Sequence, residues 1–353
     1  MKNRKNGFFF LLIFILIVSC GNREQRKKSI MVESDKSETI VGLSMDTLVV
    51  DRWRKDLEAL EREFKLRNMV LLVRDGRNSA EIQKKQILEL VEQNIDILIV
   101  IPHDSSAASD AVLPAQKRGI PIISYDRLIE KAGSDAYISF DNRNVGRLIM
   151  RELLHRVPEG RYIILNGAPK DHNSYMLREG VDDAIKTHSN KHSITILSEI
   201  WTEAWSADFA YSHIYDLLSH GENFDAVFAA NDSLAGSAVR ALSEFQKAGQ
   251  VAVGGQDADL DACQRIVEGT QIMTVYKPID LLAEKTADLV ESLLGNSNHI
   301  IPDEMISDGT CNIPYYKIPV RKVDKGTINS IIIASGYHSG KQIYQNIQTN
   351  ENR

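Results

Sequence analysis

A regular alternation of short apolar runs with amphipathic helical segments constrains this chain more than any other feature, and it occurs twice. In the first half the apolar runs predict strands at 40–45, 70–73, 97–101, 120–124 and 136–140. Helical periodicity predicts helices at 52–67, 80–93 and 106–118. Strands that are apolar on both faces and alternate with helices are typical of a parallel sheet covered by helices on each side.

The second half repeats this rhythm. Its predicted strands lie at 162–166, 194–200, 226–230, 251–255 and 272–276. Its predicted helices lie at 173–186, 207–219, 234–247, 262–268 and 278–294. The two halves together are longer than a usual single domain, which has about 100–150 residues. The sequence therefore predicts an α/β fold with two doubly wound, Rossmann-like domains of parallel sheet and a ligand cleft between them.

The start of the chain predicts where the protein resides. A basic beginning precedes an apolar run at 8–18, which is shorter than the about 20 residues that a membrane-spanning helix needs. This is typical of a signal peptide at 1–20. Cys20 stands at its edge and predicts lipidation, which would hold the protein at a membrane surface of the cell envelope, on the extracytoplasmic side. The alternative is an ordinary secretion signal in which Cys20 has no role. The polar stretch 21–38 is predicted to be a flexible tether.

Composition and motifs argue against several function classes. The net charge of −6 argues against nucleic acid as a partner. No glycine-rich phosphate cradle follows a strand, and the sequence has neither the HExxH nor the GxSxG pattern. Carboxylates near strand ends are mixed with arginine, lysine and asparagine, which favours holding a neutral polyol over glycosidase chemistry. We therefore expect no enzyme activity, no cofactor and no metal, and we interpret His103, His172 and His338 as surface or supporting residues.

The two cysteines downstream of Cys20 have no metal-binding spacing. Cys263 shares a helical face with Leu260 and Ile266, which predicts a buried core thiol. Whether Cys263 pairs with Cys311 stays open, because sequence alone does not show disulfide pairing.

Polar and charged residues follow almost every predicted strand. Ligands of doubly wound sheets bind beyond the carboxyl ends of the strands, so these residues are expected to line one cleft. Taken singly, an aspartate there often caps the next helix, and Asp141 and Asp232 are predicted to do so. Taken as a set, Asp, Asn and Arg side chains match the hydroxyls of a pyranose, and Trp53 or Trp205 suits the apolar face of its ring.

Several blocks of sequence, in order, resemble a known family. They lie at 51–56, 125–127, 137–142, 230–232, 255–260, 269–271 and 273–278. From residue 41 to about residue 338 the chain is similar to the periplasmic D-xylose-binding proteins of ABC transporters, within the type I periplasmic sugar-binding family. The resemblance implies a pentose held between two domains. His103-Asp104 departs from the family pattern and is expected to lie outside the layer that touches the sugar.

The same resemblance implies which residues contact the ligand. They are Arg52, Trp53, Asp126, Arg127, Asp171, Asn173, Trp205, Asn231, Asp257 and Lys277. Trp53 and Trp205 would cover the two faces of the ring, whereas Trp201 would be structural. The chain is expected to cross between the domains near 141–145, 276–278 and 308–313. The implied segments are a first domain at 39–142 plus 278–308, a second domain at 143–277 plus 309–341, and a polar tail at 342–353 without an assigned role.

These features predict a monomeric, lipid-anchored receptor that closes around a monosaccharide, D-xylose, and delivers it to the permease of an ABC transporter. Because the same fold and cleft serve both purposes, a sensor subunit that presents pentose to a membrane histidine kinase stays an alternative. A related pentose or a hexose stays an alternative ligand.

Overall fold

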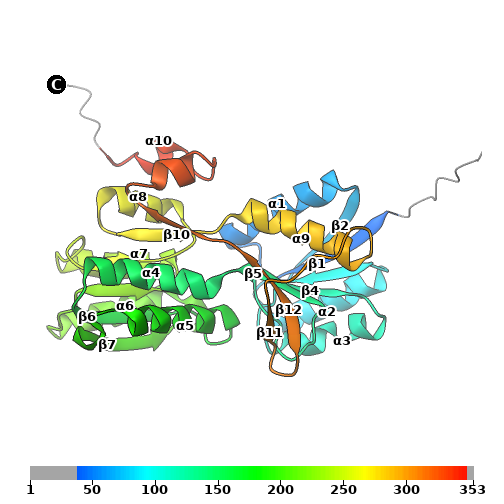
Figure 1. Cartoon of the computed structure of the whole chain (residues 1–353), viewed down its shortest axis with the longest axis horizontal. Coiled ribbons are helices and arrows are strands. Elements are labelled where there is room, and N and C mark those ends of the chain that lie inside the picture. Colours follow the sequence, from blue (N-terminus) through cyan, green and yellow to red (C-terminus); the bar gives the residue numbers. More distant parts are fainter. Residues whose placement is uncertain (1–37, 348–353) are drawn as a thin grey trace, which may run out of the picture. The chain divides into compact units, whose positions relative to one another are not determined.

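The structure is a computed structural model that describes residues 38–347, all of which lie within one compact unit. Two sheets organise this unit, and Figure 1 shows helices packed around both. We call the seven-stranded sheet with its helices the first lobe, and the six-stranded sheet with its helices the second lobe. The predicted signal peptide, Cys20 and nearly all of the predicted tether lie outside the described residues. Within 38–347, no helix has the length and apolar character needed to cross a membrane.

The first lobe is built on a sheet with the strand order β11-β12-β5-β4-β3-β1-β2. Its strands are β1 (Thr39–Met45), β2 (Met69–Asp75), β3 (Ile97–Val100), β4 (Ile122–Tyr125), β5 (Ala136–Phe140), β11 (Glu304–Ser307) and β12 (Asn312–Ile318). The strand pairs are parallel except β11–β12. Its helices are α1 (Asp51–Leu66), α2 (Ala80–Glu92), α3 (Ala108–Lys117) and α9 (Ile279–Leu293).

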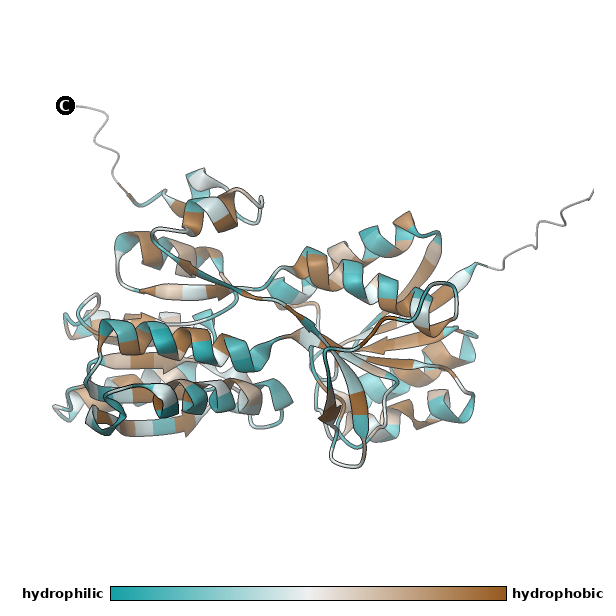
Figure 2. Cartoon of the chain, in the orientation of Figure 1, coloured by the Kyte–Doolittle hydropathy of each residue, from teal (hydrophilic) through white to brown (hydrophobic). Residues whose placement is uncertain are grey.

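The apolar run of β3 shows why these strands have no polar face. Ile97 and Ile99 belong to the core cluster that contains residues of α1 and α9, whereas Leu98 and Val100 belong to the cluster with α2 and α3. Successive side chains of a strand point to opposite faces, so both faces are buried under helices. Figure 2 shows the same contrast, with largely hydrophobic strands and helices of mixed character.

The second lobe is built on a sheet with the strand order β13-β10-β9-β8-β6-β7. Its strands are β6 (Gly160–Asn166), β7 (Ile194–Trp201), β8 (Ala226–Ala229), β9 (Ala252–Gly254), β10 (Met273–Tyr276) and β13 (Arg321–Asp324), of which β13 is antiparallel. Its helices are α4 (Asn142–Arg156), α5 (His172–Thr187), α6 (Ala207–Ser219), α7 (Asp232–Glu244), α8 (Leu260–Glu268) and the short α10 (Gly340–Ile343). The predicted class, α/β with two parallel-dominated sheets, is confirmed.

The chain passes between the lobes after β5, after β10 and after β12. The first two passages fall where they were predicted. The third prediction, near 308–313, is wrong, because Asn312–Ile318 forms β12 and pairs with β5, with Ile318 opposite Phe140. The chain enters the second lobe only between Ile318 and Arg321. The segment was misassigned because β12 follows β11 with no helix between them to mark the rhythm.

Two predicted helix caps had different outcomes. Asp141 caps α4, and its carboxylate accepts a hydrogen bond from the backbone N–H of Asn144 at 3.0 Å. The prediction for Asp232 is wrong, because its neighbour Asn231 caps α7. Asp232 is instead buried, where its carboxyl group accepts from the Thr274 hydroxyl at 2.7 Å. Burial raises the pKa of Asp232 well above its ordinary value.

The C-terminal segment packs more extensively than a polar tail would. Ile343 in α10 is fully buried in a cluster with Cys263 and Ile266 of α8, so the packed chain extends beyond residue 342. Cys263 is buried, as predicted, and Cys311 is exposed. Both thiols are free, so the two cysteines are not paired.

Two glycines allow α4 and α5 of the second lobe to approach closely. A methyl group on Gly146 of α4 would overlap the backbone carbonyl of Leu177, and one on Gly180 of α5 would overlap the carbonyl of Arg143. Backbone atoms cannot move aside as a flexible side chain does, so each position depends on the absence of a Cβ.

We expect Gly146→Ala to lower the free energy of unfolding by about 2 kcal/mol, because overpacking outweighs the gain of about 1 kcal/mol that alanine brings to a helix. Urea unfolding of the variant and the parent measures this change. Gly326→Ala is the matched control, since a methyl group there meets only the Asp324 carboxylate, at an ordinary 3.4 Å. Equal midpoints for Gly146→Ala and the parent would show that the helices tolerate a wider separation.

Candidate ligand-binding site

A cavity of about 650 Å³ is lined by both lobes. The structure brings together on its wall all of the residues predicted to contact ligand. They are Arg52, Trp53, Asp126, Arg127, Asp171, Asn173, Trp205, Asn231, Asp257 and Lys277. Most of them follow the carboxyl end of a strand or begin the helix after it, which is where a doubly wound sheet places its ligands.

Arg52, in the first turn of α1, joins carboxylates from both lobes. Its Nε lies 2.6 Å from Asp56 and its Nη2 lies 2.7 Å from Asp126, both in the first lobe. Its Nη1 lies 3.9 Å from Asp257 of the second lobe. Burial opposes the positive charge of Arg52, but the three carboxylates outweigh it and raise its pKa well above the ordinary value. Burial likewise opposes the charge on Asp126, yet Arg52 and Lys277 lower the pKa of Asp126.

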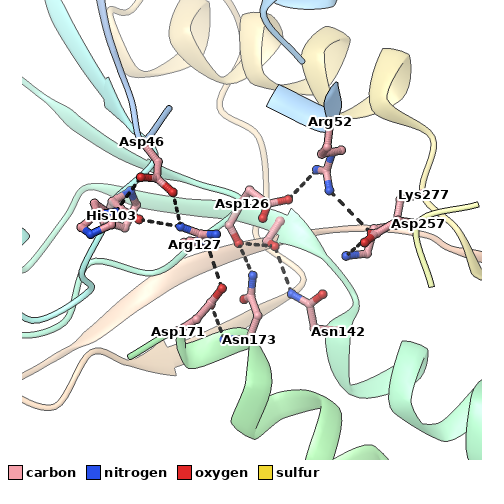
Figure 3. A network of polar contacts seen from close by, with 12 residues as sticks. Asp46, Arg52, His103, Asp126, Arg127, Asn142, Asp171, Asn173, Asp257 and Lys277 are labelled. Atoms are coloured by element: carbon pink, nitrogen blue, oxygen red, sulfur yellow. Dashed lines mark hydrogen bonds and ion pairs between the residues drawn. The ribbon is translucent and has the colours of Figure 1, made fainter. Parts of the chain in front are cut away.

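Arg127 makes a second ionic link between the lobes. Its Nη1 lies 2.7 Å from Asp46, at the end of β1, and its Nε lies 2.9 Å from Asp171, just before α5 (Figure 3). Burial raises the pKa of Asp171, and the charge of Arg127 opposes that rise. Because these groups have little access to water, their attraction is screened far less than that of a surface pair.

The amide of Asn173 is engaged with the first lobe. Its Nδ2 donates to the backbone carbonyl of Asp126 at 3.0 Å, and its Oδ1 accepts from the Tyr137 hydroxyl at 2.8 Å. Ser139 also donates to the Asp126 carbonyl, at 2.6 Å. Beside these contacts, Met176 of α5 packs with Tyr137 and other apolar residues of the first lobe. Asn173 therefore ties the lobes together as well as lining the cavity.

Two of the cavity aspartates have an unusual backbone. Asp126 has φ +60° and Asp257 has φ +97°, a region that disfavours residues with a Cβ. Lys277 Nζ lies 3.3 Å from Asp257 Oδ1. Among the described residues that oxygen accepts no hydrogen bond of good geometry, and neither does the buried Oε1 of Gln256. Buried polar atoms of this kind are costly unless a partner is supplied, so they mark where a polar ligand would be held.

The tryptophans differ in their surroundings. The ring of Trp53 is buried, and the guanidinium groups of Arg52 and Arg127 lie 5.1 and 5.2 Å from its centroid. Trp205 packs so closely on Gly167 that a methyl group there would overlap its ring. Trp201 is not among the lining residues and packs against Tyr175, with ring centroids 4.7 Å apart, as expected of a structural residue.

The cavity wall also contains residues that were not named as ligand contacts. They are Asp46, Thr47, Val50, Asn78, His103, Ala168, Lys170, Glu203, Ala204, Ser233 and Gln256. Of these, Asp46, Lys170 and Gln256 belong to the strand-end residues that were expected to line the cleft. His103 was expected to lie outside the layer that touches the ligand. The structure places its ring on the cavity wall, with Nδ1 2.7 Å from Asp46 Oδ1.

The electrostatic balance of the wall indicates the ligand's chemistry. Its basic residues are Arg52, Arg127, Lys170 and Lys277, and its acidic residues are Asp46, Asp126, Asp171, Glu203 and Asp257. Opposite charges are thus nearly matched and largely paired with one another. Within residues 38–347 no cluster of histidine, cysteine and carboxylate side chains has the arrangement of a metal site. The wall is therefore suited to a small neutral ligand with many hydroxyl groups.

Comparisons with known proteins agree with this geometry. Residues 41–298 match the family model described as a periplasmic binding protein domain. A D-xylose-binding periplasmic protein from Haemophilus influenzae is 37% identical over 305 residues, which cover 86% of this chain and 92% of the relative. Its counterpart from Escherichia coli is 34% identical over 313 residues, which cover 88% of this chain and 94% of the relative.

A solved structure shows the same fold. An ABC transporter solute-binding protein from Clostridium phytofermentans, with bound β-D-glucose, superposes with a TM-score of 0.80. The match covers 86% of this chain and 100% of that chain, at 23% sequence identity.

Removal of the Arg127 charge tests the ionic link. We expect Arg127→Met to lower the free energy of unfolding of the unliganded protein by about 3 kcal/mol, because Asp46 and Asp171 lose a buried partner. Arg143→Met is the control: its pair with Asp183 is largely exposed, so we expect a loss of about 1 kcal/mol or less. Thermal and urea unfolding give both values, and equal losses in the two variants would contradict the importance of burial.

Proposed function

Because the chain belongs to the periplasmic binding protein family and is a binding protein rather than an enzyme, we propose that its cavity binds a monosaccharide, D-xylose, outside the cytoplasm. The joint placement of all the expected contact residues on one wall carries this proposal. Support for the pentose comes from the two D-xylose-binding relatives, which align over nearly the whole length of both chains.

The chemistry of the wall supports a neutral sugar. Each hydroxyl of a pyranose both donates and accepts, and the cavity offers carboxylates that accept beside guanidinium and ammonium groups that donate. The rings of Trp53 and Trp205 supply apolar surface for the C–H faces of the sugar. An epimer that leaves one of these groups without a partner loses about 1–3 kcal/mol, which is the source of selectivity.

We infer that the two lobes act as domains that close around the sugar. Their connections after β5, β10 and β12 are the hinge, and the pairs Arg127–Asp171 and Asn173–Asp126 bridge the lobes. A sugar that contacts Asp126 on one side and Asp257 on the other would favour the closed arrangement, since a ligand shifts only an equilibrium whose states it binds unequally.

We further propose that the protein is a monomer attached to a membrane through lipidated Cys20, with its folded part outside the cytoplasm, and that it delivers sugar to the permease of an ABC transporter. If deletion of the gene leaves xylose uptake intact but abolishes a transcriptional response to xylose, the protein serves a sensor such as a histidine kinase instead.

Calorimetric titration of the purified protein with xylose, ribose, arabinose, glucose and galactose tests the ligand. We expect xylose to bind most tightly and Asp257→Asn to weaken it about tenfold or more, because a buried charged acceptor is lost. Asp183→Asn, which changes a partly exposed aspartate that is not among the cavity-lining residues, should bind like the parent. A titration in which none of these sugars binds would refute the proposed ligand class. Tighter binding of another sugar would make that sugar the ligand in place of xylose.

The anchor has a separate test. We expect Cys20→Ser to move the protein from the membrane fraction to the soluble extracytoplasmic fraction, with sugar affinity unchanged. Metabolic labelling with a fatty acid should mark the parent and not the variant. A parent that is soluble and unlabelled would show that the leader is an ordinary secretion signal.

A further inference from the structure

We propose that His103 is a specificity-determining residue whose Nε2 accepts a hydrogen bond from one hydroxyl of the bound sugar. This inference rests on the proposed function, because it assigns a further contact to the same cavity. It starts from the position of the ring: about one third of the His103 side chain is exposed, and it lines the cavity beside Asp46 and Arg127 (Figure 3).

The contact with Asp46 fixes which ring nitrogen carries the proton. Asp46 is buried, and its Oδ2 lies 2.7 Å from Arg127 Nη1, so its carboxylate only accepts hydrogen bonds. At 2.7 Å from Asp46 Oδ1, His103 Nδ1 must therefore be the donor. In a neutral imidazole the other nitrogen, Nε2, is then an acceptor. The hydrogen bonds of His103 among the described residues involve Nδ1 and the backbone N–H, and none of them uses Nε2.

A buried amide holds the backbone of His103, and Asp46 holds its ring. Gln83 of α2 accepts from the backbone N–H of His103 at 2.9 Å and donates to the carbonyl of Ile101 at 2.8 Å. Only 3% of Gln83 is exposed. An acceptor fixed at both its backbone and its ring presents Nε2 in a defined direction, which is what discrimination between hydroxyl orientations requires.

A neighbouring donor completes the site for a hydroxyl. Two nitrogens of Arg127 are occupied, Nη1 by Asp46 and Nε by Asp171, and among the described residues no hydrogen bond uses Nη2. A ligand hydroxyl between the two side chains would accept from Arg127 and donate to His103. The Arg and Lys groups of the wall only donate and its carboxylates only accept, so His103 adds an uncharged acceptor that prefers a donating hydroxyl.

Two substitutions separate this contact from an indirect role through Asp46. In His103→Asn the amide nitrogen replaces Nδ1 and keeps the hydrogen bond to Asp46, but nothing replaces Nε2. In His103→Gln the longer amide reaches the place of Nε2 and loses the bond to Asp46. We expect His103→Asn to weaken sugar binding about tenfold and His103→Gln to stay within a few-fold of the parent. The reverse order would show that His103 only positions Arg127, and unchanged binding in both variants would overturn the inference.

A set of xylose analogues, each lacking one hydroxyl, identifies the contact when both variants bind weakly. For one analogue, the parent and His103→Asn should bind equally, because the hydroxyl that Nε2 accepts from is gone. A loss that persists with every analogue overturns the contact. Unfolding curves of the variants confirm that they are folded. If the parent protein binds no sugar, both the proposed function and this inference are refuted. If the parent binds sugar but no more tightly than His103→Asn, only this inference is refuted.

Discussion

The Arg127 guanidinium stands between a carboxylate of each lobe, and the arrangement of the cavity depends on this bridge. Asp46 follows the first strand of the first lobe, and Asp171 precedes the first helix after β6 in the second lobe. Charges removed from water must be paired, or the structure loses several kcal/mol. The side chains of the two lobes can satisfy this requirement only where their strand ends face one another. The ionic wall is therefore part of how the lobes fit together, as well as a surface that a ligand would touch.

The same pairing limits what the cavity can accept. Asp46, Asp126 and Asp171 are already paired with arginine side chains of the wall. An anionic ligand would have to compete with these carboxylates for the same arginines. A neutral polyol can instead insert hydroxyls among the paired groups, donating to one side and accepting from the other. Asn173 of the second lobe links the lobes without a charge, because both the oxygen and the nitrogen of its amide contact the first lobe. Arg127 and Asn173 therefore link the two lobes and line the cavity at the same time.

The sequence predicted most of the features that depend on local periodicity, although helix α4 was missed. Buried strands such as β3 have an unmistakable apolar run, and the polar residues after them must gather at one edge of a parallel sheet. Features set by distant contacts were misjudged. Strand β12 joins the first sheet because Tyr315 and Ile318 complete its core beside β5, which a local pattern does not show. His103 was placed outside the ligand layer because it departs from the family pattern, and a sequence pattern does not show its contact with Asp46 at the cavity wall.

Strain in the backbone shows how the two halves of the wall are maintained. A non-glycine residue in a disfavoured φ region costs about 1–3 kcal/mol and persists only where its surroundings impose it. Asp126 and Asp257 are both such residues, and both carboxylates approach Arg52. The backbone carbonyl of each of these turn residues has a hydrogen-bond partner. Ser139 and Asn173 donate to the Asp126 carbonyl, and the Tyr337 hydroxyl approaches the Asp257 carbonyl at 3.4 Å.

The second of these turns depends on the end of the chain. His338 donates to the carbonyl of Ala258, which also has a positive φ, and the Tyr337 ring lies 4.0 Å from Lys55 Nζ of α1. The C-terminal segment therefore supports the strained turn that presents Asp257 and contacts the first lobe at the same time. The backbone of Asp257 is therefore supported by the C-terminal segment, while its carboxylate approaches Arg52 of the first lobe.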